Sequence, residues 1–152
     1  MPTIKIKTEI HSDKKKCFDL ARNIELHQES LEFSEEKAIA GKTKGLIGKD
    51  EWVCWEAKHL GFVQHLTSKI TEFDEPNYFV DEMVMGAFKS FRHEHRFEET
   101  NAGTEMIDVF HFESPLGILG KIANTLFLKK YMKSLLKTRS QFLKEKAEAL
   151  EK

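Results

Sequence analysis

The sequence predicts an α+β fold in which a curved antiparallel sheet wraps around one long C-terminal helix. Two observations predict it. From about residue 35 to residue 113, apolar and polar residues alternate in short segments separated by turn residues, as in strands. From about residue 118 the apolar period becomes helical and stays so to about Leu150. A helix with a broad apolar face must bury it, and a strongly twisted sheet curls to receive it.

The N-terminal part predicts one strand and two short helical segments. Thr3 to Ile10 alternates between apolar and polar residues, which predicts a half-buried strand. Ser12 or Asp13 offers an N-cap for a short helix that runs through Ala21. A second short helical or turn segment is expected from about Ile24 to Leu31.

Six further strands are expected to form a meander. The links between them are short and rich in turn residues, whereas parallel neighbours need a crossover of a dozen or more residues. With the first strand they make a seven-stranded antiparallel sheet, in the order β-α-α-β6-α. The six segments are Lys37 to Gly41, Glu51 to His59, Phe62 to Phe73, Tyr78 to Met85, Phe88 to Glu98 and Thr104 to Glu113.

The last helix is expected from about Ile118 to Leu150, and no Pro or Gly interrupts it after Gly120. Lysines cover the rest of its surface, which is most simply a solvated face. No repeat, linker or low-complexity stretch divides the chain, so residues 1–152 are expected to form a single domain. The apolar face of the helix carries Ile118, Ile122, Leu128, Met132, Leu135, Phe142 and Leu143.

Composition excludes several classes of partner. The chain has 24 basic and 25 acidic residues, so it presents no basic field for nucleic acid or for an anionic membrane. No apolar run approaches the ~20 residues of a membrane span. Cys17 and Cys54 form neither a metal-binding spacing nor a disulfide framework, and the N-terminus lacks the apolar core of a signal peptide. We therefore expect a cytoplasmic protein, either a monomer or a weak homodimer.

The aromatic content favours an apolar cavity. Twelve phenylalanines stand against two tyrosines and two tryptophans, and Phe is apolar to its tip. Trp52 and Trp55 lie on opposite faces of one predicted strand, so we expect one in the core or cavity wall and the other partly exposed.

The sharpest polar feature is a His-Asp pair on the predicted inner face of the sheet. Strand alternation places Phe91, His93, His95 and Phe97 on one face. If the turn at residues 101–103 closes a regular hairpin, Phe97 lies near Thr104 and His93 near Asp108. The inner wall then continues through Thr104, Met106, Asp108, Phe110 and Phe112.

This pair has several interpretations. It could be a buried structural network, or the polar end of a pocket that bonds a carbonyl or hydroxyl of a ligand. His93 oriented by Asp108 could act as a general acid or base. His93 and His95 could also ligate a metal with Asp108 or Glu82, but no fourth ligand has a recognisable spacing. We expect no catalytic residue, no metal and no cofactor.

Two other charged residues have alternative placements. A two-residue turn at Gly86-Ala87 would pair Glu82 with Phe91 and point it inward, whereas a one-residue shift would point it into water. Arg139 lies in the apolar stripe of the last helix. It either extends to the surface along its own stem or pairs at the pocket mouth with an anionic ligand group or an inner carboxylate.

The chain resembles the START, Bet v 1 and polyketide cyclase-like proteins, the SRPBCC superfamily, and most closely its bacterial single-domain branch. The resemblance covers essentially the whole chain and implies the helix-grip fold. It also implies an apolar ligand cavity, although members of the superfamily range from lipid carriers to cyclases. The residues that carry it are Phe79 to Glu82, Gly86 to Phe88, Phe91 to Phe97, Gly103 to Asp108, Ser114 to Gly117 and Arg139.

The leading functional prediction is a protein that holds a lipid, isoprenoid or polyketide-like molecule between the sheet and the last helix. His93, His95 and Asp108, with Arg139 and Glu82, would bind its polar part. One alternative is a cyclase- or dehydratase-like enzyme that uses the same His-Asp pair. Another is a protein-interaction module with a small or filled cavity. The predicted apolar wall comprises Trp55, Phe62, Leu66, Phe91, Phe97, Met106, Phe110 and Met132.

Overall fold

The computed structural model describes residues 2–59, 61–86, 88–113 and 118–151, without the side chains of residues 118–125. Three expectations lie outside the described residues: the turn residue Ala87, the link Ser114 to Gly117, and the packing of Ile118 and Ile122.

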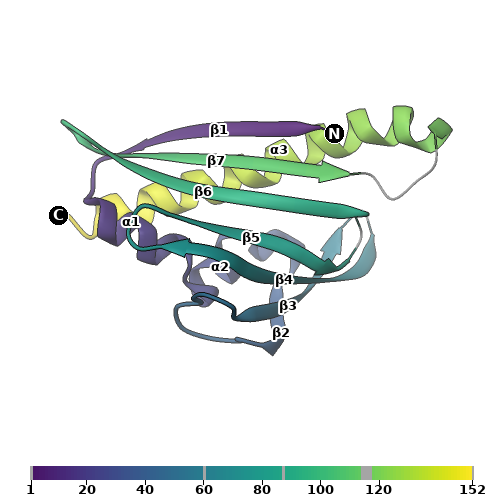
Figure 1. Cartoon of the computed structure of the whole chain (residues 1–152), viewed down its shortest axis with the longest axis horizontal. Coiled ribbons are helices and arrows are strands. Elements are labelled where there is room, and N and C mark those ends of the chain that lie inside the picture. Colours follow the sequence, from purple (N-terminus) through teal and green to yellow (C-terminus); the bar gives the residue numbers. More distant parts are fainter. Residues whose placement is uncertain (1, 60, 87, 114–117, 152) are drawn as a thin grey trace.

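The described residues form a seven-stranded sheet with three α-helices (Figure 1). The strand order is β1-β7-β6-β5-β4-β3-β2, and every neighbouring pair is antiparallel, which confirms the predicted fold class. The predicted bounds differ from the observed ones by at most two residues. The elements are β1 (Thr3–Ile10), α1 (Lys14–Ala21), α2 (Ile24–Ser30), the 3-10 turn η1 (Glu32–Ser34), β2 (Lys37–Gly41), β3 (Trp52–His59), β4 (Phe62–Asp74), β5 (Tyr78–Met85), β6 (Ser90–Thr100), β7 (Gly103–Glu113) and α3 (Ile118–Ala149).

Side-chain caps fix the starts of the two short helices. Of the two candidate caps of α1, Asp13 is the one used, and its carboxylate accepts a hydrogen bond from the Lys16 amide at 2.9 Å. Asn23 caps α2 in the same way and accepts from the Leu26 amide at 3.0 Å. Each bond satisfies an amide that the first helical turn leaves without a partner.

The hairpin of β6 and β7 has a different register from the one expected. Thr100 lies opposite Gly103, so only two residues form the loop, and this places His95 rather than His93 opposite Asp108. Likewise Phe97 lies opposite Met106 rather than Thr104. The expected pairing is therefore wrong by two residues. Because side chains alternate with a period of two, the shift leaves the inner face unchanged.

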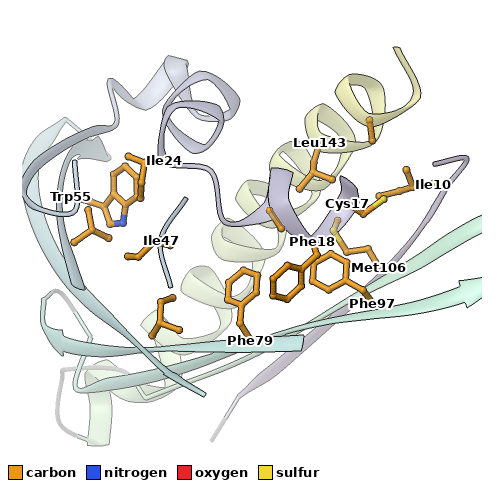
Figure 2. Close-up of a cluster of buried hydrophobic side chains, with 14 residues drawn as sticks. Ile10, Cys17, Phe18, Ile24, Ile47, Trp55, Phe79, Phe97, Met106 and Leu143 are labelled. Carbon is orange, nitrogen blue, oxygen red and sulfur yellow. The ribbon is translucent and has the colours of Figure 1, made fainter. Parts of the chain in front are cut away.

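The core packs around α1. The Phe18 ring meets those of Phe79 and Phe97 edge-on, with both centroids 5.5 Å away (Figure 2). It meets the Phe73 ring in the same way at 5.4 Å. Met106 belongs to the same cluster and is fully buried. Phe97 and Met106 were expected in the cavity wall. They pack in the core instead, because α1 and the C-terminal half of α3 cover this end of the sheet.

Helix α3 lies along the concave face of the sheet (Figure 1). Lys129, Lys130, Lys133 and Lys137 are exposed, as expected of the solvated face. Over the described residues, no helix combines the length and the apolar composition that crossing a bilayer would take. The buried stripe of α3 comprises Leu135, Leu136, Arg139, Ser140, Leu143 and Ala147, spaced by three or four residues.

Candidate functional site

A pocket of about 240 Å³ lies among residues of the sheet, α2 and α3. It adjoins two clusters of apolar side chains, one around Phe18 and one around Phe110. The lining includes Trp55, Leu66, Phe91, Phe110 and Met132, five of the eight residues predicted for the apolar wall. Further apolar lining comes from Val53, Ile70, Phe79, Phe88, Leu128, Leu135 and Leu136.

Polar side chains from β5, β6, β7 and α3 meet at the centre of the sheet. This inner cluster consists of Asp81, His93, His95, Asp108, Arg139 and Ser140. Asp108 is fully buried and accepts hydrogen bonds from His93 at 2.9 Å and from Ser140 at 3.2 Å. One Arg139 nitrogen lies 3.5 Å from the same carboxylate, and the other donates to the Ala21 carbonyl at 3.1 Å.

His93 and His95 lie between the two aspartates. His95 donates to Asp81 at 2.6 Å, while the nearest contact of His93 with Asp81 is 3.9 Å and too long for a hydrogen bond. The two imidazole rings stack with their centroids 3.7 Å apart, and Phe79 covers the other side of His95 at 4.1 Å. The histidines are thus held by packing as well as by charge.

The cluster holds its aspartates ionised. Burial alone would raise the pKa of Asp108, but the His93 hydrogen bond and the neighbouring Arg139 and His95 outweigh it, so this pKa lies far below its usual value. Burial likewise opposes ionisation of Asp81, and the His95 hydrogen bond and nearby positive charge lower its pKa below the ordinary value. Burial, with the charge of His93, lowers the pKa of His95 to about 4, so His95 is neutral at pH 7.

Asp81, His93 and His95 also bring three potential metal ligands within 4.8 Å of one another. As they stand, Asp81 and His95 are bonded to each other, and the two imidazoles are stacked rather than splayed around a common point. A cation here would have to break that hydrogen bond and separate the two stacked rings. The donors therefore do not fit a metal in this arrangement.

A second polar group, the edge cluster, lines the pocket near the β2 edge of the sheet. It consists of His27, Glu36, His59 and Tyr131. The Tyr131 hydroxyl lies 2.7 Å from His59 Nδ1, and Glu36 lies 3.3 Å from His27 Nε2. Burial and the charge of Glu36 raise the pKa of Tyr131. Strand β4 separates β3, which carries His59, from β5, which carries Asp81, so the pocket has two polar regions.

Two predicted site residues are placed elsewhere. Glu82 lies opposite Arg92 on the convex face, 3.3 Å from its guanidinium, so its inclusion in the site is wrong. The register of β5 and β6 is the shifted alternative, and it turns Asp81 inward instead. Phe62 is 70% exposed at the start of β4 and does not line the pocket, so its place in the apolar wall is also wrong.

The other predicted polar residues meet in the inner cluster. Arg139 is buried and bound to Asp108, which is the alternative that pairs it with an inner carboxylate. Trp55 is 7% exposed and Trp52 is 46% exposed, as expected for neighbouring side chains on opposite faces of one strand.

The sequence analysis missed Asp81, although a signal for it existed. Charge pairing of Glu82 with Arg92 on the outer face of the sheet places Asp81 on the inner face. No sequence signal joins Glu36 to Tyr131.

No protein-family model matches the sequence, and no curated protein matches it. Solved structures do. The chain is 19% identical to TTHA0849 from Thermus thermophilus, with a TM-score of 0.72 over 93% of this chain and 97% of that one. It is 14% identical to major latex-like protein 151 from Panax ginseng, with a TM-score of 0.67 over 96% and 97% of the chains. Ara h 8.0201 is 12% identical, with a TM-score of 0.66 over 93% and 97%. These likenesses show the fold: a Bet v 1-like, helix-grip arrangement of sheet and C-terminal helix.

Proposed function

We propose that the protein binds a small, largely apolar molecule in the pocket between the sheet and α3. The observation that carries the proposal is a cavity of about 240 Å³ with aromatic and aliphatic walls and a few convergent polar groups. Ligand pockets in proteins typically measure about 300–1,000 Å³, so this cavity lies at the small end of the range. That volume suits a ring or short chain better than a sterol.

The inner cluster would orient the ligand. Asp81, His93, His95 and Arg139 line the pocket, whereas Asp108 is fully buried behind them. Buried polar groups that are already bonded to one another are rigid, so a ligand meets a preorganised surface rather than a mobile one. The inner cluster thereby combines the structural and the ligand-binding interpretations of the His-Asp pair.

Native mass spectrometry of gently purified protein tests the proposal, beside NMR titration of the ¹⁵N-labelled chain with 2-phenylethanol. We expect a co-purifying mass that is lost on denaturation, and shifts of pocket amides. Met132→Trp should abolish both because it fills the pocket, while Lys133→Trp, on the exposed face of the same helix, should not. An apo mass together with no amide shift at millimolar 2-phenylethanol would refute the proposal.

The cyclase- or dehydratase-like enzyme is a second candidate, favoured by one contact. His93 lines the pocket with Asp108 behind it at 2.9 Å, the arrangement that orients an imidazole for proton transfer. If the protein is such an enzyme, His93→Gln abolishes turnover of the identified ligand, and the variant still binds that ligand. Unchanged turnover in His93→Gln would exclude this role. The interaction-module hypothesis, with its small or filled cavity, stays a prediction; the pocket of about 240 Å³ argues only against a completely filled interior.

Cytoplasmic location and a monomeric or weakly dimeric state stay predictions. Cys17 and Cys54 are both free thiols, which suits a reducing compartment. Light scattering coupled to size exclusion measures the assembly state directly.

A further inference from the structure

The pocket wall offers a ligand no free cation among the described residues. Among the side chains that the structure describes, Arg139 and Arg22 are the fixed cations that line it, and no lysine does. Arg139 is bound to Asp108 and to a backbone carbonyl. Arg22 donates to Asp19 at 3.0 Å and to the Ile47 carbonyl at 3.2 Å. A buried anionic ligand would therefore lack a charged partner, which is costly.

Asp81 is the most accessible charged group of the inner cluster. Its side chain keeps 18% of its surface accessible, against 8% for His93, 5% for His95 and none for Asp108. His95 bonds one oxygen of Asp81, and no described residue hydrogen-bonds to the other oxygen. A carboxylate accepts about four hydrogen bonds, so Asp81 has unused capacity.

Acceptors exceed donors in the inner cluster. The neutral His95 uses its one N–H on Asp81, and its Nδ1 has no hydrogen-bond partner among the described residues. Asp81 and Asp108 are both ionised, whereas Arg139 is the one fixed cation of the cluster. Aromatic rings of Trp55, Phe79 and Phe91 line the same cavity, and the faces of such rings attract cations.

We propose that the ligand is a small primary or secondary amine on an apolar or aromatic body, and that its protonated nitrogen pairs with Asp81. This inference rests on the proposed function and names the chemical class for it. An ammonium supplies only donors, which is what the inner cluster lacks. The cavity volume limits the apolar body to about one ring with a short chain.

Three ligands of matched size test the charge: 2-phenylethylamine, 2-phenylethanol and phenylacetate. In a Trp52→Phe background, Trp55 in the pocket wall is the sole tryptophan and reports binding by fluorescence, with calorimetry as a second readout. At pH 7 we expect the amine to bind at least tenfold more tightly than the alcohol, and phenylacetate to bind most weakly.

Asp81→Asn should remove the preference for the amine over 2-phenylethanol, because the Asn amide carries no charge for the ammonium to pair with. Glu82→Gln is the matched control, because it neutralises the next residue on the convex face and should change neither affinity. The inference is overturned if the alcohol or phenylacetate binds wild type as tightly as the amine, or if Asp81→Asn keeps the preference. The wild-type ranking decides even if Asp81→Asn does not fold.

Different results would overturn the amine inference and the proposed binding of an apolar molecule. Binding of the alcohol without preference for the amine overturns the amine inference and leaves the proposed function standing. Binding of none of the three ligands, with no co-purified molecule, overturns both. Loss of the preference in Glu36→Gln but not in Asp81→Asn would overturn the assignment to Asp81 and place the amine at the edge cluster.

Discussion

Asp108 holds the inner cluster together at the scale of single residues. It binds His93, Ser140 and Arg139 from two elements and has no exposed surface. The free energy of desolvating these charges is offset only while each has its partner, so removal of one partner leaves an uncompensated buried charge. The aspartate is therefore structural even though its neighbours line a pocket.

We expect Asp108→Asn and Arg139→Met each to lower the free energy of unfolding by about 3–5 kcal/mol. The double variant should lose less than the sum of the two, because the second change removes the charge that the first left unpaired. Urea denaturation of the four proteins measures the coupling. Strictly additive losses would show that the 3.5 Å contact carries no energy.

His95 should make stability depend on pH. Its pKa is about 4 in the folded protein and about 6.5 when unfolded, so the unfolded chain binds the extra proton between these values. Stability is then lost as pH falls from about 6.5 to 4, and the low pKa of Asp108 extends the loss further into acid.

His95→Gln keeps an N–H donor for Asp81 but cannot titrate. We expect a smaller decrease in unfolding free energy between pH 7 and pH 5 than in wild type. His11→Gln, at an exposed position, serves as the control and should keep the wild-type slope. Equal slopes for His95→Gln and wild type, from denaturant melts at each pH, would contradict the burial of a neutral His95.

At the scale of elements, α1 decides which part of the sheet is core and which part is cavity. Its Phe18 packs edge-on against Phe97 and Phe79 (Figure 2), and Phe97 does not line the pocket. Phe91, on the same strand as Phe97, and Phe110, on β7 with the core residue Met106, line the pocket. The same alternation in β6 and β7 thus supplies core at one end and cavity wall at the other.

Phe18→Ala should lower the free energy of unfolding by about 3–5 kcal/mol, because it removes a fully buried ring that three other rings contact. Phe62→Ala makes the same change at a position that is 70% exposed, and should cost about 0.5 kcal/mol or less. Thermal and urea melts compare the two. A large loss in Phe62→Ala would show that it packs against something in solution.

At the scale of the whole molecule, a cavity between side chains lies next to a tightly packed core. Protein interiors are usually close-packed, and a cavity forgoes contacts that a larger side chain would make. Both apolar clusters border the same cavity. Space that no side chain fills costs packing energy, and the proposed ligand-binding function would give a reason for that cost.

A larger side chain in the cavity should raise stability and weaken ligand binding. Ala57 is buried in the pocket wall, and Ala57→Ile should raise the free energy of unfolding by about 0.5–2 kcal/mol while weakening 2-phenylethanol binding. Lys58→Ile places the same residue at the exposed neighbouring position of β3 and separates strand propensity from filling. Ala57→Ile with unchanged affinity would show that the ligand lies elsewhere.

The sequence by itself determined the elements and the sheet's two faces. The signals are local: the alternation in Thr3–Ile10 and Ser90–Thr100, the turn residues between strands, and the apolar stripe of α3. Local sterics and solvation determine secondary structure from such patterns. They were sufficient for the fold class, for the inward-facing His93, His95 and Asp108, and for the exposed lysines of α3.

Only the tertiary structure decided what depends on register and on distant partners. A one-residue difference between β5 and β6 exchanged Glu82 for Asp81 in the site, since each step in register reverses every side chain. Phe97, which was expected in the cavity wall, belongs to the core because α1 packs against it. The edge cluster joins Glu36 to Tyr131 across most of the chain, and only folding the sheet around α3 brings them together.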